Sequence, residues 1–449
     1  MIGNWPGDLL EVLLKDLRYI VTQDEDRRVL RGKDILIKEG FIEEIGNIKG
    51  PVDEVVDCSE YVAIPGLINT HTHVPMVLFR GVADDMDLFP WLQEKIWPME
   101  SKLTPYHIKA GTRLGLLEAV RTGTTTLFDM YFFEGVIAEE FVNFGVRGVL
   151  GQAIIDFGTP ECSSGEECLK LADNFVSTWI NKNSLVEPSY GPHAPYTVSP
   201  ERLAEIAGKS SELGVYIQIH LAETRKEVED LRGKYGRGPI ELAHSSGILG
   251  DKTVAAHVVW PSYDEMMLLS RSRTLVSHNP VSNLKLASGI SPVPDLISLN
   301  VIVTLGTDGA ASNNTLDMIE TMKITAILHK AIKGDPTVVP AQSVLDMATI
   351  IPGEFLRWKI GRIVPGYEAD IVLLKTRVPW WTPLHSVVSH IVYSARSTDV
   401  HYVFIAGKPI IEKGLLSSER EEEIICEAEK ASLDLLERSG VSSLLKNMN

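Results

Sequence analysis

Two histidines separated by one residue, His71 and His73, follow the dipeptide Pro65-Gly66 in an apolar run near the start of the chain. Side chains of a β-strand alternate between its two faces, so residues two apart point the same way. The pair can therefore hold one metal ion through two imidazoles, which are common zinc ligands. The alternative is that both are polar side chains at a strand end without a ligand, and the pair alone does not decide between the two.

Reactive side chains also stand at or near the ends of later apolar runs. These residues are His193, His220 with Glu223, His257, His278 and Asp308. Each histidine alone could be structural, but together they predict a site assembled from several strands, and His278 fits a loop-anchoring role equally well. The histidines of helix-like or C-terminal segments are interpreted as structural: His107, His244, His329, His385, His390 and His401.

These residues need a fold that brings the ends of successive strands together. Eight apolar strand-like runs alternate with helix-like segments, a pattern that predicts a TIM (β/α)8 barrel of the α/β class. In such a barrel the chemistry lies at the carboxyl ends of the strands. The predicted strands are Val62 to His73, Thr124 to Met130, Arg147 to Ile155, Leu185 to His193, Val215 to Glu223, Thr253 to Trp260, Thr274 to Asn279 and Val301 to Asp308.

Both ends of the chain carry a different pattern, of short alternating strands and tight turns. We expect them to form together a second, small β-sandwich domain. The last segment is rich in glutamate with apolar residues at helical spacing, which predicts an amphipathic helix packed on the outside. The predicted domains are a composite β-sandwich of 1–64 plus 365–416, a barrel of 65–364 and a C-terminal helical segment of 417–449.

The composition of the chain limits the classes of molecule that it can bind. The chain has 449 residues and a formal net charge of −17, which repels nucleic acids and anionic membranes and leaves a small molecule as the expected partner. Four cysteines are too few and too scattered for a disulfide framework or a thiolate zinc cluster, which fits a reducing cytoplasm. Charged residues such as Asp8 and Glu11 interrupt the N-terminal apolar stretch and argue against a signal peptide. A cytoplasmic protein is expected.

Longer motifs around the strand ends resemble those of the amidohydrolase superfamily. They are Pro65 to His73, His220-Leu221-Ala222-Glu223, Ser277-His278-Asn279-Pro280 and Gly306-Thr307-Asp308-Gly309. The resemblance covers nearly the whole chain and includes the split β domain. Members with two metal ions usually bridge them with a modified lysine at the end of strand 4. This chain has no lysine there, so the resemblance implies one metal ion.

Loop motifs resemble more narrowly the 5′-methylthioadenosine/S-adenosylhomocysteine deaminases. These motifs are Arg80 to Asp85, Ile96 to Glu100, Gly191 to Tyr196 and Ala311 to Met318. The resemblance implies hydrolytic deamination of 5′-methylthioadenosine to 5′-methylthioinosine and of S-adenosylhomocysteine to S-inosylhomocysteine, with release of ammonia. The alternatives are 5′-deoxyadenosine, adenosine, guanine or cytosine deamination, or triazine hydrolysis, on the same scaffold. A non-catalytic scaffold is disfavoured because every ligand position is filled.

The proposed metal ligands are His71, His73, His220 and Asp308. Zinc is expected, with iron(II) and manganese(II) as alternatives, because all three accept nitrogen and oxygen donors. Three imidazoles and a carboxylate leave a place for water, whose pKa the metal lowers so that it can attack adenine C6. Asp308 would then be both ligand and base, while Glu223 would protonate a ring nitrogen and His257 would orient the developing hydroxyl.

The same resemblance assigns contacts to the substrate. Glu100 would accept hydrogen bonds from the ribose hydroxyls, His193 would contact the base or sugar, and Trp97 would lie beside the 5′ substituent unless it serves packing alone. Some relatives have an arginine at the end of strand 3, where this chain has Gln152 and Asp156. Whether either contacts substrate is left open. Barrels of this family commonly associate, so a homo-oligomer is a further possibility.

Overall fold

The computed structural model describes residues 11–418 and 420–440, so Asp8 lies outside the described residues. The chain divides into two compact units. The sheet unit comprises Met1–Asn69, Leu117–Thr126 and Asp317–Glu421, and the barrel unit comprises Thr70–Leu116, Leu127–Leu316 and Glu422–Asn449. The domain boundaries expected from the sequence stay a prediction.

Eight strands form one sheet whose spatial order follows the chain, which confirms the predicted (β/α)8 fold. Strands β9 to β14 are buried throughout, as parallel strands covered on both faces are. The amide of Asp308 donates to the carbonyl of His71 at 3.0 Å, so the end of the last strand meets the first. The strands are β8 (Leu67–Thr72), β9 (Thr124–Tyr131), β10 (Arg147–Ile154), β11 (Val186–Pro192), β12 (Tyr216–Leu221), β13 (Thr253–His257), β14 (Leu275–His278) and β15 (Ile302–Leu305).

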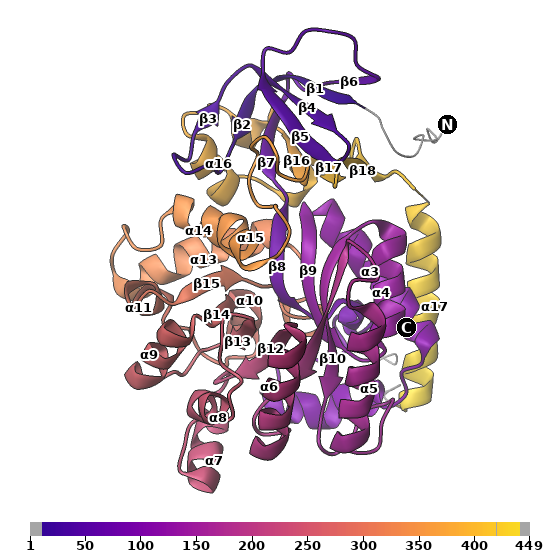
Figure 1. The fold of residues 1–449 in the computed structure, drawn as a ribbon, viewed down its shortest axis with the longest axis vertical. Coiled ribbons are helices and arrows are strands. Elements are labelled where there is room, and N and C mark those ends of the chain that lie inside the picture. The colour runs from indigo at the N-terminus through magenta and orange to yellow at the C-terminus, as the bar shows by residue number, and fades with distance from the viewer. Residues whose placement is uncertain (1–10, 419, 441–449) are drawn as a thin grey trace. The chain divides into compact units, whose positions relative to one another are not determined.

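Helices follow the strands along the chain (Figure 1). Side chains cap the first turns of several of these helices. Ser262 and Glu265 form a capping box. Helix α13 begins at Met318, because the Asp317 carboxylate accepts the amides of Ile319 and Glu320 in its first turn. The helices are α3 (Pro105–Arg121), α4 (Glu134–Phe144), α5 (Gly165–Trp179), α6 (Pro200–Leu213), α7 (Arg225–Tyr235), α8 (Pro239–Ser245), α9 (Tyr263–Ser272), α10 (Pro280–Lys285), α11 (Val293–Ser298), α12 (Ala310–Asn313), α13 (Met318–Lys333), α14 (Ala341–Ala348), α15 (Ile350–Phe355) and α16 (Val387–Tyr393).

The first predicted barrel strand is divided into two strands in the structure. The run from Val62 to His73 divides at Gly66 into β7 (Tyr61–Pro65), which pairs with β16 (Ile371–Lys375), and barrel strand β8. A Cβ on Gly66 would lie 2.2 Å from Oγ1 of Thr125, so only glycine allows this approach of β8 to β9. The prediction of one strand was wrong because this close contact comes from a distant part of the sequence.

The sheet unit holds two further sheets, built from both chain ends, which confirms the composite β-sandwich. Their shared core includes Leu14 and Ile35 from the N-terminal part and Leu373 and Phe404 from the C-terminal part, each at most 1% exposed. One sheet has the order β5-β4-β1-β6 and the other β19-β18-β17-β16-β7-β2-β3. The remaining strands are β1 (Val12–Leu17), β2 (Tyr19–Val21), β3 (Val29–Leu30), β4 (Lys33–Lys38), β5 (Phe41–Gly46), β6 (Glu54–Asp57), β17 (Val400–Ile405), β18 (Lys408–Glu412) and β19 (Leu415–Leu416).

The C-terminal segment forms helix α17 (Glu421–Ser439), which runs along α3 (Figure 1). Nε2 of His107 on α3 lies 2.9 Å from the Asp434 carboxylate on α17, in agreement with a structural role for this histidine. Ile424 and Ala428 are buried, whereas the apolar side chains of Ile425 and Leu433 are 43% and 51% exposed.

Two of the four cysteines are joined, a pairing that the sequence analysis did not predict. Cys162 and Cys168 form a disulfide that joins the loop after β10 to helix α5, while Cys58 is a buried thiol and Cys426 an exposed one. In the part of the chain that the structure describes, no helix has the length and apolar character needed to cross a membrane.

Replacing Gly66 by alanine should lower the free energy of unfolding by about 1–3 kcal/mol, because the added methyl group must displace Thr125 in a packed region. Gly208 on α6 is the matched control, since a Cβ there meets nothing within 4 Å and alanine favours the helix by up to about 1 kcal/mol. Chemical denaturation of both variants checks this. An unchanged Gly66→Ala midpoint would contradict the close contact.

Candidate active site

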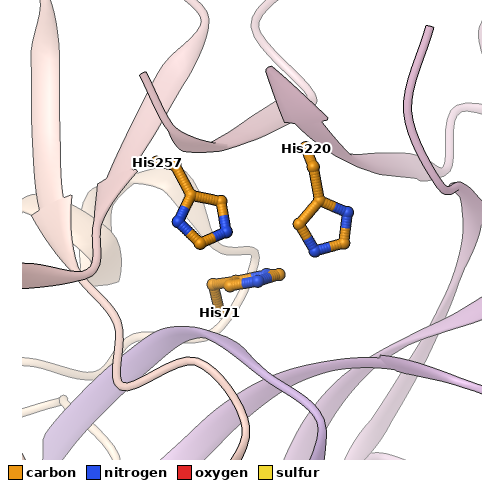
Figure 2. A group of neighbouring side chains, drawn as sticks. All are labelled: His71, His220 and His257. Atoms are coloured by element: carbon orange, nitrogen blue, oxygen red, sulfur yellow. The ribbon is translucent and has the colours of Figure 1, made fainter. Parts of the chain in front are cut away.

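Imidazole rings from three strands converge inside the barrel unit. Figure 2 shows His71 from β8, His220 from β12 and His257 from β13 turned toward a common space. One ring nitrogen of each lies within 4.8 Å of the others, and the same limit holds for a group formed by His71, His73 and Asp308. All four predicted ligands are therefore together, with His257 beside them.

The orientation of His73 and His220 fits a bound cation. Nδ1 of His73 lies 2.6 Å from the carbonyl of Met130, and Nδ1 of His220 lies 2.8 Å from that of His193. A carbonyl accepts only from a protonated nitrogen, so each neutral ring has its lone pair on Nε2. The two Nε2 atoms are 3.3 Å apart, where lone pairs repel one another and a shared cation would bind both.

Asp308 faces the same space with a fixed carboxylate. Its Oδ1 lies 3.3 Å from Nε2 of His73 and 3.5 Å from Nε2 of His71. Its Oδ2 accepts the hydroxyls of Ser282 at 2.6 Å and Ser312 at 2.8 Å. These hydrogen bonds hold one oxygen toward the imidazoles, as an oriented metal ligand requires.

Burial and the Asp308 carboxylate determine the pKa values of the three histidines predicted to bind the metal. Burial lowers the pKa of His71 to about 4 and that of His220 well below its ordinary value. Burial also lowers the pKa of His73, but the Asp308 carboxylate outweighs this and raises it to about 9. Without a cation, His73 and Asp308 therefore hold a proton near neutral pH, and a cation would replace that proton.

Glu223 lies next to these residues. Oε2 of Glu223 is 3.8 Å from Nε2 of His257, and the Ser288 hydroxyl donates to Oε1 at 3.2 Å. Burial raises the pKa of Glu223, which favours a protonated carboxyl group. Nδ1 of His257 lies 2.8 Å from Oδ1 of Asn283, so its proton is on Nδ1 and Nε2 can accept a hydrogen bond.

Three residues at or near the ends of barrel strands in the site have an unusual backbone conformation. Ala222, His257 and Asp308 have φ angles of 52°, 73° and 63°, in the left-handed region that non-glycine residues rarely adopt. Each lies just beyond or at the end of a barrel strand. The unusual conformation turns the chain at the points where the reactive side chains stand, as at other functional sites.

One pocket is lined by His73, His220 and Asp308, three of the four predicted metal ligands, and by the predicted substrate residues Glu100, His193, Glu223 and Trp97. His71 is not among the described lining residues of this pocket. Part of its lining comes from 3-10 helix η1 (Val74–Phe79), α1 (Leu88–Trp91), π-helix η2 (Leu92–Ile96) and α2 (Trp97–Glu100). Burial raises the pKa of Glu100 to about 7, although a hydrogen bond from the Tyr131 hydroxyl, 2.8 Å away, acts in the opposite direction. The sequence analysis missed Tyr131, which occupies the last position of β9, where the strand-end rule would have found it.

Three other candidates are not part of the described pocket lining. Gln152 accepts the amide of Glu134 at 3.2 Å and donates to Glu161 at 3.0 Å. Asp156 accepts the amide of Ser199 and Nε of Arg202. His278 is buried at the end of β14 but lies outside the lining. Gln152 and Asp156 therefore hold the loop after β10.

Reacting groups at the carboxyl ends of barrel strands place the protein among the (β/α)8 barrel enzymes. The chain belongs to the amidohydrolase family, whose family model matches residues 62–410. It is thus a hydrolase of a family that acts on C–N bonds.

Individual relatives cover most of the chain. A 5′-deoxyadenosine deaminase of Methanopyrus kandleri is 45% identical over 89% of this chain and 94% of its own length. A 5-methylthioadenosine/S-adenosylhomocysteine deaminase of Pyrococcus furiosus is 44% identical over 87% and 94%. An adenosine deaminase of Xanthomonas campestris, solved with bound zinc, is 33% identical, covers 96% of this chain and 99% of its own, and superposes with a TM-score of 0.92.

Zinc affinity of the metal-free protein should rise with pH up to about 9, by up to about tenfold per pH unit, since the ion displaces one proton from His73 and Asp308. His220→Gln should lower the affinity by more than about 100-fold, because even the loss of outer-shell partners costs about 10- to 100-fold. Competition with a chelator of known affinity measures both. The exposed His244→Gln is the control, and a pH-independent affinity would contradict the prediction.

Proposed function

We propose that the protein hydrolytically deaminates adenosines altered at the 5′ position, with release of ammonia. The substrates would be 5′-methylthioadenosine, giving 5′-methylthioinosine, and S-adenosylhomocysteine, giving S-inosylhomocysteine, with 5′-deoxyadenosine as the close alternative. The supporting observation is the pocket itself, which has metal donors and Glu223 together with the buried Glu100 carboxylate. The names of the archaeal relatives point to the same substrates.

One divalent cation would be held by His71, His73, His220 and Asp308. Bound there, it would act as a Lewis acid that lowers the pKa of water. Zinc is our choice because it is bound in the Xanthomonas relative, and iron(II) or manganese(II) would accept the same donors.

The protein's own groups would move the protons. Asp308 Oδ1 would take a proton from the attacking water, while protonated Glu223 would donate to the ring nitrogen beside C6. Nε2 of His257 would accept a hydrogen bond from the oxygen added at C6 and orient it. Breakage of the C6–N bond after transfer of a proton to the amine would release ammonia and leave the hypoxanthine product. Burial supports this role for Glu223, since it raises the pKa of the carboxyl group.

Glu100 would bind the ribose. Its carboxylate can accept both vicinal hydroxyls, and the Tyr131 hydroxyl fixes one of its oxygens. His193 would contact the base or sugar from the end of β11, with Nδ1 held 2.9 Å from the Thr197 hydroxyl. Trp97 would lie beside the 5′ substituent.

Enzyme loaded with zinc should convert 5′-methylthioadenosine to a hypoxanthine product, followed by ammonia release and the ultraviolet spectrum. Glu223→Gln should lower kcat by about 10²–10⁴, the usual contribution of general acid–base catalysis, without loss of metal. The exposed Glu229→Gln, on the adjacent helix α7, is the control. Failure of the metal-loaded protein to turn over any 5′-substituted adenosine would overturn the proposed function.

Glu100→Gln tests the ribose contact separately from the chemistry. Hydrogen bonds to a charged acceptor contribute about 1.5–3 kcal/mol, so kcat/KM for adenosine should fall by about 10- to 100-fold. The wild-type preference for adenosine over 2′-deoxyadenosine should shrink in the variant, because the partner of the 2′-hydroxyl is altered. Exposed Glu94→Gln on η2 serves as control. An unchanged preference would show that Glu100 does not bind the ribose.

A further inference from the structure

Among its described lining residues, the pocket lacks the long cationic side chains that usually bind carboxylates. Its lining contains the carboxylic residues Glu100, Glu223 and Asp308, and none of its described lining residues is a lysine or an arginine. A negatively charged group on the 5′ side of the substrate, away from the histidines, would therefore find no lysine or arginine among the described lining residues.

The part of the pocket next to Glu100 is apolar. Ile96 and Trp97 precede Glu100 by four and three residues on the helical segment, so their side chains share its face. Ile155, directly after β10, also lines the pocket and is 4% exposed. If Glu100 binds the ribose hydroxyls, these side chains are the neighbours that a 5′ substituent would meet.

Cationic side chains near the pocket already pair with carboxylates. Nε of Arg202 lies 2.9 Å from the Asp156 carboxylate, in the segment that directly follows Ile155. Nζ of Lys285 lies 2.6 Å from Asp84. The neighbour of Trp97 on the loop after β10 is also apolar. The Trp97 ring packs against that of Phe157, with the centroids 5.6 Å apart.

We propose that this pocket selects adenosines with a small uncharged 5′ group, such as 5′-methylthioadenosine and 5′-deoxyadenosine, over S-adenosylhomocysteine. This selectivity rests on the proposed function and ranks the proposed substrates by kcat/KM. A methyl or methylthio group gains from burial against Ile96, Trp97 and Ile155. The homocysteine tail instead brings an ammonium and a carboxylate that must both lose water, and no lysine or arginine of the described lining would pair with the carboxylate.

The test is a kinetic comparison on the zinc-loaded wild-type protein. It uses 5′-methylthioadenosine, 5′-deoxyadenosine, S-adenosylhomocysteine and 5′-butylthioadenosine, which has the carbon chain of the homocysteine tail without its charges. We expect kcat/KM for S-adenosylhomocysteine to be at least about 100-fold below that for the butylthio compound, because a site discriminates strongly where a polar group is left unpaired.

The outcomes are distinguishable. Equal kcat/KM for S-adenosylhomocysteine and the butylthio compound would overturn selection by charge. If both were also far below 5′-methylthioadenosine, the length of the 5′ group rather than its charge would decide. Turnover of none of the four compounds would instead overturn the proposed function.

A variant supplies the missing cation. Ile155→Arg places a guanidinium, which binds carboxylates through two hydrogen bonds, at the apolar side of the pocket. The ratio of kcat/KM for S-adenosylhomocysteine to that for 5′-methylthioadenosine should rise at least about tenfold, whereas Ile155→Met should keep the wild-type ratio. A folded Ile155→Arg protein with an unchanged ratio would overturn the proposal, and if it does not fold the wild-type comparison decides.

Discussion

The opposed lone pairs of His73 and His220 are the interaction on which the rest of the site depends. Backbone carbonyls of Met130 and His193 fix the two rings, so their Nε2 atoms face each other at 3.3 Å. This arrangement is unfavourable without a proton or a cation between them. Because these carbonyls belong to barrel strand β9 and to the end of β11, the sheet itself sets the ring positions, and folding of the barrel creates a place where a proton or a cation is favoured.

The pocket combines two environments that suit two parts of one substrate. Polar and titratable groups gather at the strand ends, where a reaction at a purine ring would take place, and apolar side chains gather around Trp97. Tyr131 lies between them, with its ring 6.1 Å from that of His73 and its hydroxyl on Glu100. Tyr131 thus contacts both the titratable groups at the strand ends and Glu100 beside the apolar part of the pocket.

Local patterns predicted much of this architecture. Strand periodicity and residue type sufficed for the barrel and for the convergence of His71, His73, His220 and Asp308, because both depend on short stretches of sequence. The dipeptide Pro65-Gly66 is a turn signal at the point of division, but the contact of Gly66 with Thr125 on another strand does not follow from the local pattern. The partners of Gln152 and Asp156, and the disulfide after β10, likewise depend on which loops meet in space.

The left-handed residues at the strand ends bear on how the protein tolerates change. Ala222, His257 and Asp308 each hold a conformation that glycine would adopt without strain, and two of them carry side chains assigned to the reaction. Selection for stability alone would favour relaxing these positions, whereas selection for activity opposes it. A descendant that lost its catalytic role would be free to gain stability at these strand ends first, and glycine there in a barrel of this family would indicate that the chemistry had been abandoned.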